Sequence, residues 1–152
     1  MKLIEEKGDL FNLPLKYDLA HCISLDCAMG MGIAKEFDKK YEDLKPILIE
    51  TIKANNLTYP ITISVPIELL EDGDPSIIHN LITKERYWHK PSYFTITECI
   101  KQLVYQCERY NTKHLAMPKI GCGLDRLRWN IVKEIISKEF ANMDIEIIVR
   151  HL

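Results

Sequence analysis

The sequence predicts a single α/β domain in which a mixed sheet carries helices on both faces. Segments typical of strands alternate along the whole chain with segments whose apolar residues recur at helical spacing. The chain has 152 residues, 47% of them hydrophobic, which is enough for one core, and it shows no repeat, low-complexity tract or linker. We therefore expect one domain over residues 1–152, with a strand order that the pattern leaves open.

The first third contains two strand candidates followed by a helix. Leu3–Glu6 is a short strand that ends at the turn-prone pair Gly8-Asp9, and Leu19–Ser24 (LAHCIS) is a more apolar strand. Within Ile33–Leu44 the apolar residues fall on one helical face, so this segment predicts a helix.

The middle of the chain predicts a short helix and a strand at an edge of the sheet. Pro46 is expected to end the preceding helix and to begin a second one, which runs to about Ala54. Ile61–Val65 alternates apolar and hydroxyl side chains, and the proline on each side of it indicates an edge strand. Glu71–Pro75 (EDGDP) is a turn.

The remaining segments continue the alternation. Ile77–Thr83 (IIHNLIT) predicts a strand, and Ser92–Tyr110 has the apolar spacing of a long helix. A strand at His114–Pro118, a helix at Leu127–Phe140 and a β-branched strand at Ile145–Val149 complete the chain. This order of elements predicts a mixed sheet between two layers of helices.

Composition and charge narrow the function classes. The net charge of -2 excludes a whole-protein cationic field, although one basic cluster is present: Lys84, Arg86, His89 and Lys90. No apolar run reaches the ~20 residues that span a bilayer, and the N-terminus lacks signal-peptide features, so we expect a cytoplasmic protein that does not bind membranes. The five cysteines are odd in number and lack CxxC spacing, which predicts reduced thiols without a metal site.

Two segments share the order strand, glycine-bearing loop, helix. LAHCIS is followed by LDCAMGMG, and HLAMPKI by GCGLD, with a helical pattern after each loop. Glycine lets the backbone turn sharply and approach a ligand, and a helix start offers unpaired N–H groups. The loops hold four of the six glycines: Gly30, Gly32, Gly121 and Gly123. They predict a diphosphate-binding crevice, with simple turns as the alternative. There is no P-loop motif, and GxGxxG is incomplete.

Three further residues are candidates for the site, each with a structural alternative. Asp9 can accept a hydrogen bond from an exocyclic amine such as that of adenine, or act as a turn or cap residue. Asp125 can serve as a general base or cap the following helix. Lys84 can act as an amine nucleophile beside other cations, or lie solvated at a strand end.

Four segments resemble the terminal ADP-ribose protein glycohydrolase branch of the macrodomains: GDLF, HCISLDCAMGMGIA, LITKERYWHKP and MPKIGCGLDRLRW. They occur in the same order and span nearly the whole chain, except for a weak zone at about residues 45–74. The resemblance implies a three-layer α/β/α macrodomain that binds ADP-ribose and needs no cofactor or metal.

The resemblance also implies residue roles. Asp9 and Leu10 would contact the adenine, and Lys84 and Asp125 would be the catalytic pair. The ribose and diphosphate would be held by residues of the two glycine loops: Met29, Gly30, Met31, Gly32, Ile33, Ala34, Ile120, Gly121, Cys122, Gly123 and Leu124.

The implied reaction is covalent. The Lys84 amine would attack the anomeric carbon of the distal ribose after ring opening, and Asp125 would assist proton transfer. Implied substrates are ADP-ribosylated glutamate or aspartate, O-acyl-ADP-ribose and ADP-ribosylated DNA bases. The first loop carries Ser24, Asp26 and Cys27 in place of the paired asparagines of the hydrolytic macrodomains, which favours the lysine route.

Two other functions are left open, a non-catalytic ADP-ribose reader and an ADP-ribose 1''-phosphate phosphatase. Tyr87-Trp88 is bulkier than the family pattern and can stack on a base or cover the site. We expect a monomer, since a module that binds a small ligand needs no symmetric interface.

Overall fold

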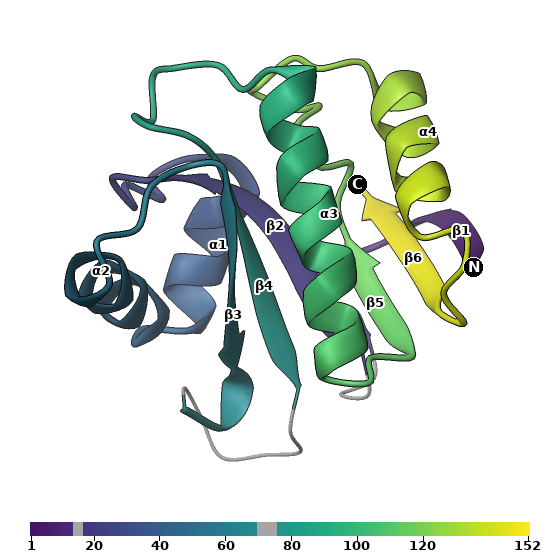
Figure 1. Cartoon of the computed structure of the whole chain (residues 1–152), viewed down its shortest axis with the longest axis horizontal. Helices are drawn as coiled ribbons and strands as arrows, with labels where there is room; N and C mark the ends of the chain where they lie inside the picture. Colours follow the sequence, from purple (N-terminus) through teal and green to yellow (C-terminus); the bar gives the residue numbers. More distant parts are fainter. Residues whose placement is uncertain (14–16, 70–75) are drawn as a thin grey trace.

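A computed structural model describes residues 1–13, 17–69 and 76–152, and it confirms a mixed sheet between helical layers (Figure 1). The six strands are β1 (Lys2–Lys7), β2 (Asp18–Ser24), β3 (Ile61–Pro66), β4 (Ile77–Lys84), β5 (His114–Met117) and β6 (Glu146–His151). They are arranged in the order β1-β6-β5-β2-β4-β3. All six predicted strands are therefore present, and their spatial order is new information.

Strand direction determines where loops gather. β1, β6, β5, β2 and β4 are mutually parallel, whereas β3 runs antiparallel to β4, with Pro66 opposite Ile77. The predicted edge position of β3 is confirmed, because proline lacks the N–H that a central strand would need. The parallel strands bring their carboxyl ends, and the loops that follow them, to the same edge of the sheet.

Four helices cover the sheet: α1 (Gly32–Lys40), α2 (Leu44–Ala54), α3 (Tyr93–Arg109) and α4 (Trp129–Glu139). Two short 3₁₀ helices, η1 (Leu10–Asn12) and η2 (Ile67–Leu69), follow β1 and β3. The start of α3 is fixed by a capping box, in which the Ser92 side chain accepts from the Thr95 N–H and the Thr95 hydroxyl accepts from the Ser92 N–H. No helix in the described part of the chain combines the length and apolarity needed to cross a bilayer.

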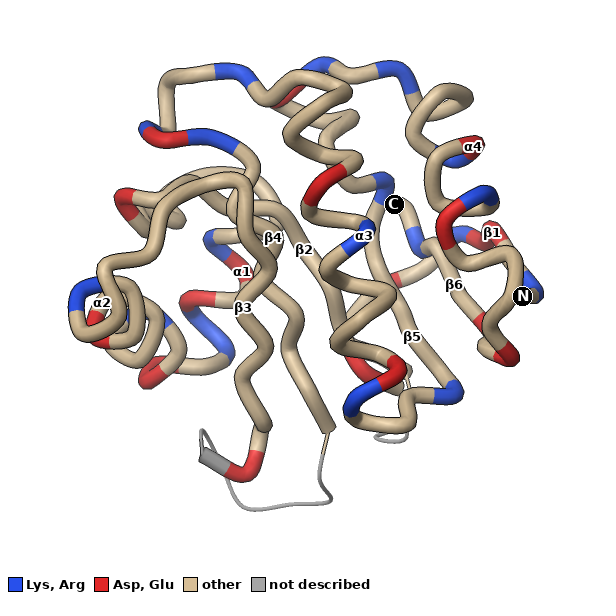
Figure 2. Tube along the Cα trace, viewed as in Figure 1, with Lys and Arg blue, Asp and Glu red and all other residues tan. Residues whose placement is uncertain are grey.

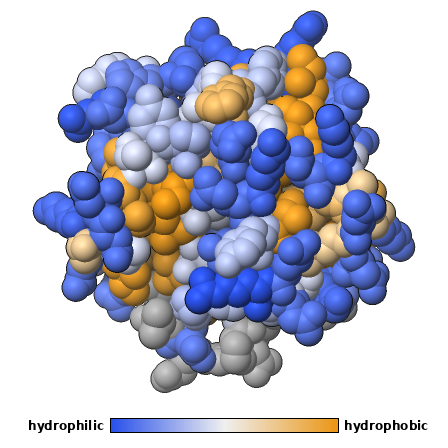
Figure 3. Space-filling view, viewed as in Figure 1, coloured by the Kyte–Doolittle hydropathy of each residue, from blue (hydrophilic) through white to orange (hydrophobic). Residues whose placement is uncertain are grey.

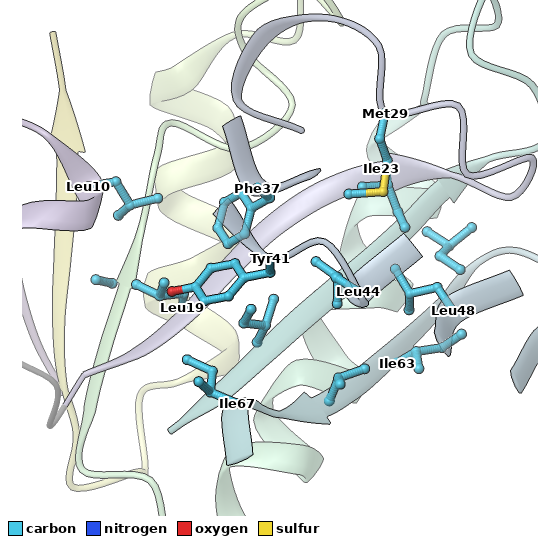
Figure 4. Close-up of a cluster of buried hydrophobic side chains, with 14 of the residues drawn as sticks. Leu10, Leu19, Ile23, Met29, Phe37, Tyr41, Leu44, Leu48, Ile63 and Ile67 are labelled. Atoms are coloured by element: carbon cyan, nitrogen blue, oxygen red, sulfur yellow. The ribbon is translucent and has the colours of Figure 1, made fainter. Parts of the chain in front are cut away.

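The core consists of two clusters, one on each face of the sheet. α1 and α2 bury Phe37, Leu44 and Leu48 against one face (Figure 4), and α3 and α4 bury residues such as Leu103 and Ile136 against the other. The visible outer surface is largely hydrophilic, with apolar residues in separate patches (Figure 3). The sheet is thus a rigid support for the loops at its edge.

Three predicted boundaries differ from the structure. α1 ends at Lys40 and α2 begins at Leu44, so Pro46 neither ends the first helix nor begins the second. It occupies the third position of α2, where a missing N–H costs nothing because the first four N–H groups of a helix have no internal partner. α4 begins at Trp129 rather than at Leu127. The predicted turn at Glu71–Pro75 lies outside the described residues.

Candidate functional site

Three loops meet at the carboxyl edge of the sheet: residues 25–31 after β2, 85–92 after β4 and 118–128 after β5. The first two run side by side, because the Leu25 N–H donates to the Lys84 carbonyl (2.9 Å) and the Asp26 N–H to the Glu85 carbonyl (3.2 Å). These bonds extend the β2–β4 pairing beyond the strand ends, so the loops keep a defined relative position.

The third loop contacts both of the others. Lys90 Nζ donates to the Leu124 carbonyl at 2.7 Å. A Cβ added at Gly32 would lie 3.4 Å from Leu124 Cδ1, so the first and third loops touch at this point. The two glycine loops that the sequence singled out are therefore neighbours in space.

Lys84 and Asp125 form an ion pair at the junction of these loops. Lys84 Nζ lies 2.6 Å from Asp125 Oδ1, and only 12% and 14% of the two side chains are exposed. Lys84 is thus not a solvated strand-end lysine. Asp125 does not cap α4 either, because the N-cap residue of that helix is Arg128. Both structural alternatives for these residues were wrong, and the pair brings an amine and a carboxylate together.

The glycine loops adopt left-handed backbone conformations. In the first loop φ is positive at Cys27 (53°), Met29 (48°) and Gly32 (60°). In the second, Gly121 has φ of 72°, and a Cβ there would lie 2.7 Å from a side-chain carbon of Ile96. A side chain at Gly121 would therefore be strained by the positive φ and would displace the end of the Ile96 side chain.

The predicted ligand-binding residues differ in how deeply they are buried. Leu10, Met29 and Ile120 are buried in the core, the first two in the cluster of Figure 4, so only their backbone is available to a ligand. Met31 and Leu124 are exposed. The others are exposed glycines or partly buried residues, apart from the buried Gly121: Gly30, Gly32, Gly123, Ile33, Ala34 and Cys122.

Asp9 lies at the same edge of the sheet but far from Lys84. Its Oδ1 accepts the Phe11 N–H at 2.9 Å, which makes it the cap of η1, as the structural alternative proposed. β1 and β4 are four strand positions apart, so their ends are separated by ~19 Å at the usual strand spacing. The predicted contacts thus lie along an elongated strip, with Asp9 and Lys84 at its ends.

Asp26 is a residue whose role sequence reasoning missed. Its carboxylate accepts hydrogen bonds from the Ser24 hydroxyl, the Ala28 N–H (3.2 Å) and the Tyr87 N–H (3.1 Å). Burial opposes the charge, but the hydrogen bonds from Ser24, Tyr87 and Ala28 outweigh it and lower the pKa of Asp26. A carboxylate in a turn commonly bonds nearby residues, so the bonds from Ser24 and Ala28 could be expected from the sequence. Nothing in the sequence indicates the bond from the Tyr87 N–H.

Burial raises the pKa values of the cysteine thiols near the site. Burial raises the pKa of Cys22 well above its usual value, and nearby Cys99, Asp125 and Cys122 raise it further. Burial likewise raises the pKa of Cys122 to about 11. All five cysteines are free. Because the thiolate is the nucleophilic form, these environments disfavour a cysteine nucleophile at this edge of the sheet.

The chain matches a known family over most of its length. The family model described as Macro domain matches residues 24–136. Human "ADP-ribose glycohydrolase OARD1" is 40% identical over 143 residues, which cover 94% of this chain and 87% of the human protein.

Solved structures have the same fold at lower identity. The "Macrodomain of Thermus aquaticus DarG" is 22% identical, with a TM-score of 0.86 over 99% of this chain and 98% of that one. "Thermosipho africanus DarTG in complex with ADP-ribose" is 21% identical, with a TM-score of 0.84 over 98% of this chain and 41% of that one. These likenesses establish the three-layer architecture.

Proposed function

Because this chain belongs to the macro domain family and is 40% identical to an ADP-ribose glycohydrolase, we propose that it is an ADP-ribosyl hydrolase that releases ADP-ribose from modified macromolecules. The observation that carries this proposal is the Lys84–Asp125 pair at the loop junction. An amine and a carboxylate within hydrogen-bonding distance supply a nucleophile and a proton acceptor in one place.

The proposed ligand lies along the strip of loops. Its adenine is near Asp9, its diphosphate is over the first and third loops, and its distal ribose is at Lys84. Backbone N–H groups of the two glycine loops and of the first turn of α1 would hold the diphosphate, as helix starts and left-handed loops commonly do. A solved relative carries ADP-ribose, according to its description.

The proposed reaction uses Lys84 as the attacking group. The Lys84 ammonium first gives a proton to Asp125, whose Oδ1 is 2.6 Å away, and the neutral amine then attacks the anomeric carbon of the distal ribose. The bond from this carbon to the modified group breaks, and the group leaves with the bonding electrons. The ribose ring then opens as the lysyl nitrogen forms an imine at this carbon, and the ring oxygen takes up the proton that the nitrogen loses. Water hydrolyses the imine, which releases ADP-ribose and restores the amine.

Ester-linked groups suit this reaction because a carboxylate is a stable leaving group. We therefore include ADP-ribosylated glutamate or aspartate and O-acyl-ADP-ribose among the substrates. ADP-ribosylated DNA bases are included because a relative from Thermus aquaticus is described as a "DNA ADP-ribosyl glycohydrolase". The proposed reaction does not require a metal.

A non-catalytic ADP-ribose reader is disfavoured by the ion pair itself. Partial burial of two charges costs desolvation energy, and binding of a ligand with two negative phosphates gains nothing from a neighbouring carboxylate. A reader has no need of Asp125 at the distal end of the site. A catalyst does, because the attacking amine must lose a proton.

The test is turnover of three substrates: an ADP-ribosylated glutamate peptide, an ADP-ribosylated oligonucleotide and O-acetyl-ADP-ribose. Wild type, Lys84→Ala and Asp125→Ala are compared with Lys53→Ala, a control at an exposed lysine of α2. We expect turnover of at least one substrate by wild type and Lys53→Ala and its loss in the two site variants. Absence of ADP-ribose binding by calorimetry in the wild type would overturn the proposal.

A further inference from the structure

Two large aromatic side chains are exposed in the loop that follows Lys84. Tyr87 and Trp88 are 59% and 62% exposed, although aromatic rings of this size are usually mostly buried. They follow the Lys84 position by three and four residues, in the loop that leads from β4 to α3. An exposed aromatic pair next to a reaction site is a candidate binding surface.

The pair is held in place by its own loop. The Tyr87 N–H donates to Asp26 Oδ2 at 3.1 Å, and the rings of Tyr87 and Trp88 pack edge to face with centroids 5.0 Å apart. The loop closes on itself, since the His89 N–H donates to the Arg86 carbonyl (3.0 Å) and the Arg86 N–H donates to His89 Nδ1 (3.3 Å). A ligand that stacks here therefore meets rings whose backbone is already ordered.

Basic residues are frequent in the loop of the aromatic pair and in the neighbouring β5–α4 loop. Four exposed basic residues come from the β4–α3 and β5–α4 loops: Arg86, Lys90, Arg126 and Arg128. Figure 2 shows Lys and Arg positions of both loops along one rim of the molecule. Acidic residues in these loops are fewer. Two of them already have partners, since Asp26 accepts a hydrogen bond from the Tyr87 N–H and Asp125 forms an ion pair with Lys84. This rim is locally basic in a chain whose net charge is -2.

We propose that Tyr87 and Trp88 form a stacking platform for an unpaired base of a single-stranded nucleic acid that carries the ADP-ribose. The basic residues of the two loops would contact the phosphates of the strand, a combination typical of single-strand binding. A duplex hides its base faces inside the stack, whereas an unpaired base exposes one to these rings. The inference rests on the proposed function and selects one of its substrate classes.

A peptide carrying a modified glutamate fits this surface less well. An acidic peptide would be attracted by the same cations, but a glutamate side chain has no flat face to lie against an exposed indole. Salt should therefore weaken the binding of either partner. Loss of the aromatic pair should weaken the binding of the nucleic acid alone.

The test compares wild type with Trp88→Ala and Tyr87→Ala. Tyr105→Ala serves as the control, because Tyr105 is 63% exposed and lies on α3 away from the loop junction. Binding of a labelled, unmodified single-stranded oligonucleotide is measured by fluorescence anisotropy, with the matching duplex as a second probe. Turnover of an ADP-ribosylated oligonucleotide and of an ADP-ribosylated glutamate peptide is measured in parallel.

The expected result is wild-type binding of the single strand in preference to the duplex. Affinity should fall about tenfold in each platform variant and be unchanged in Tyr105→Ala. The ratio of oligonucleotide to peptide turnover should fall by a similar factor. Equal affinity of wild type and Trp88→Ala, or a selective loss of peptide turnover, would overturn the platform. Failure of the proposed function is distinguished from this by absent ADP-ribose binding in calorimetry.

Discussion

The Oδ2 atom of Asp26 accepts a hydrogen bond from the Tyr87 N–H at 3.1 Å, although 61 positions separate the two residues. This bond joins the glycine loop after β2 to the loop that follows Lys84, residues 85–92. The same carboxylate also accepts a hydrogen bond from the Ala28 N–H at 3.2 Å, so it bonds the backbone of both loops. We therefore expect Asp26 to act as a positioning residue, through the backbone of the residues that it bonds.

Replacement of Asp26 by Asn should slow turnover more than it weakens binding. The amide keeps one acceptor oxygen but places an NH₂ donor against either a backbone N–H or the Ser24 hydroxyl. We expect kcat to fall roughly tenfold, about 1–2 kcal/mol, with a smaller change in ADP-ribose affinity. Asp43→Asn is the control, since Asp43 is exposed and its side chain caps nothing. An unchanged kcat would show that the bond has no positioning role.

Asp125→Asn separates proton transfer from ligand binding. The amide preserves the size of the side chain but does not accept a proton from the Lys84 ammonium, so the amine stays protonated. We expect turnover to fall on the order of 100-fold or more, while ADP-ribose still binds. Calorimetry and single-turnover kinetics on the same variant provide the measurement. Turnover close to that of wild type would contradict the assigned role of Asp125.

Gly121 and Gly123 lie in the same loop, and their alanine variants test whether the loop needs a left-handed backbone at Gly121. Gly121→Ala forces a side chain into a positive φ of 72° and within 2.7 Å of an Ile96 carbon, so the free energy of unfolding should fall by about 1–3 kcal/mol. Gly123→Ala meets nothing within 4 Å and should change it by less than about 0.5 kcal/mol. Urea denaturation measures both. Equal stabilities would show that the loop does not need the left-handed conformation.

His21 should make the fold sensitive to acid. The residue is fully buried, its ring stacks on Phe37 and its Nε2 hydrogen-bonds Asn80 Oδ1 at 2.7 Å. Burial lowers the pKa of His21 from 6.5 to about 4, against a smaller raising effect of the Asn80 bond. As the pH falls, His21 of the unfolded chain therefore takes up a proton at a higher pH than His21 of the folded chain does. The stability due to neutral His21 is intact above pH 6.5 and is lost as the pH falls towards 4.

The measurement is the free energy of unfolding between pH 7 and pH 4 for wild type, His21→Gln and His89→Gln. The wild type and the exposed-histidine control His89→Gln should lose about 3 kcal/mol more than His21→Gln over this interval. Identical pH dependence in all three proteins would show that His21 does not resist protonation in the fold.

Much of the fold could be predicted because its signals are local. The apolar pattern of Ile77–Thr83 indicates a buried strand, and Pro60 and Pro66 on either side of Ile61–Val65 indicate an edge. The strand order could not be predicted, since it depends on which faces pack together over long sequence separations. The break between α1 and α2 was misplaced, because a proline in the first helical turn has no hydrogen bond to lose and gives no fixed boundary.

The site was predictable to a similar degree. The motifs around Lys84 and Asp125 singled out both residues, and the structure brings their side chains together. The burial of Leu10, Met29 and Ile120 could not be foreseen, because a loop sequence does not tell which side chains turn inward. The bond between Asp26 and Tyr87 was equally hidden, since it joins loops that only the sheet brings side by side.

Chemical trapping at Lys84 tests the proposed lysine mechanism most directly. Wild type and Lys84→Arg are incubated with an ADP-ribosylated substrate in the presence of borohydride, and the products are mapped by peptide mass spectrometry. The lysine mechanism predicts a reduced ADP-ribosyl adduct on Lys84 of the wild type and neither adduct nor turnover in Lys84→Arg. Full turnover by Lys84→Arg, or rapid turnover by wild type without any adduct on Lys84, would contradict the lysine mechanism.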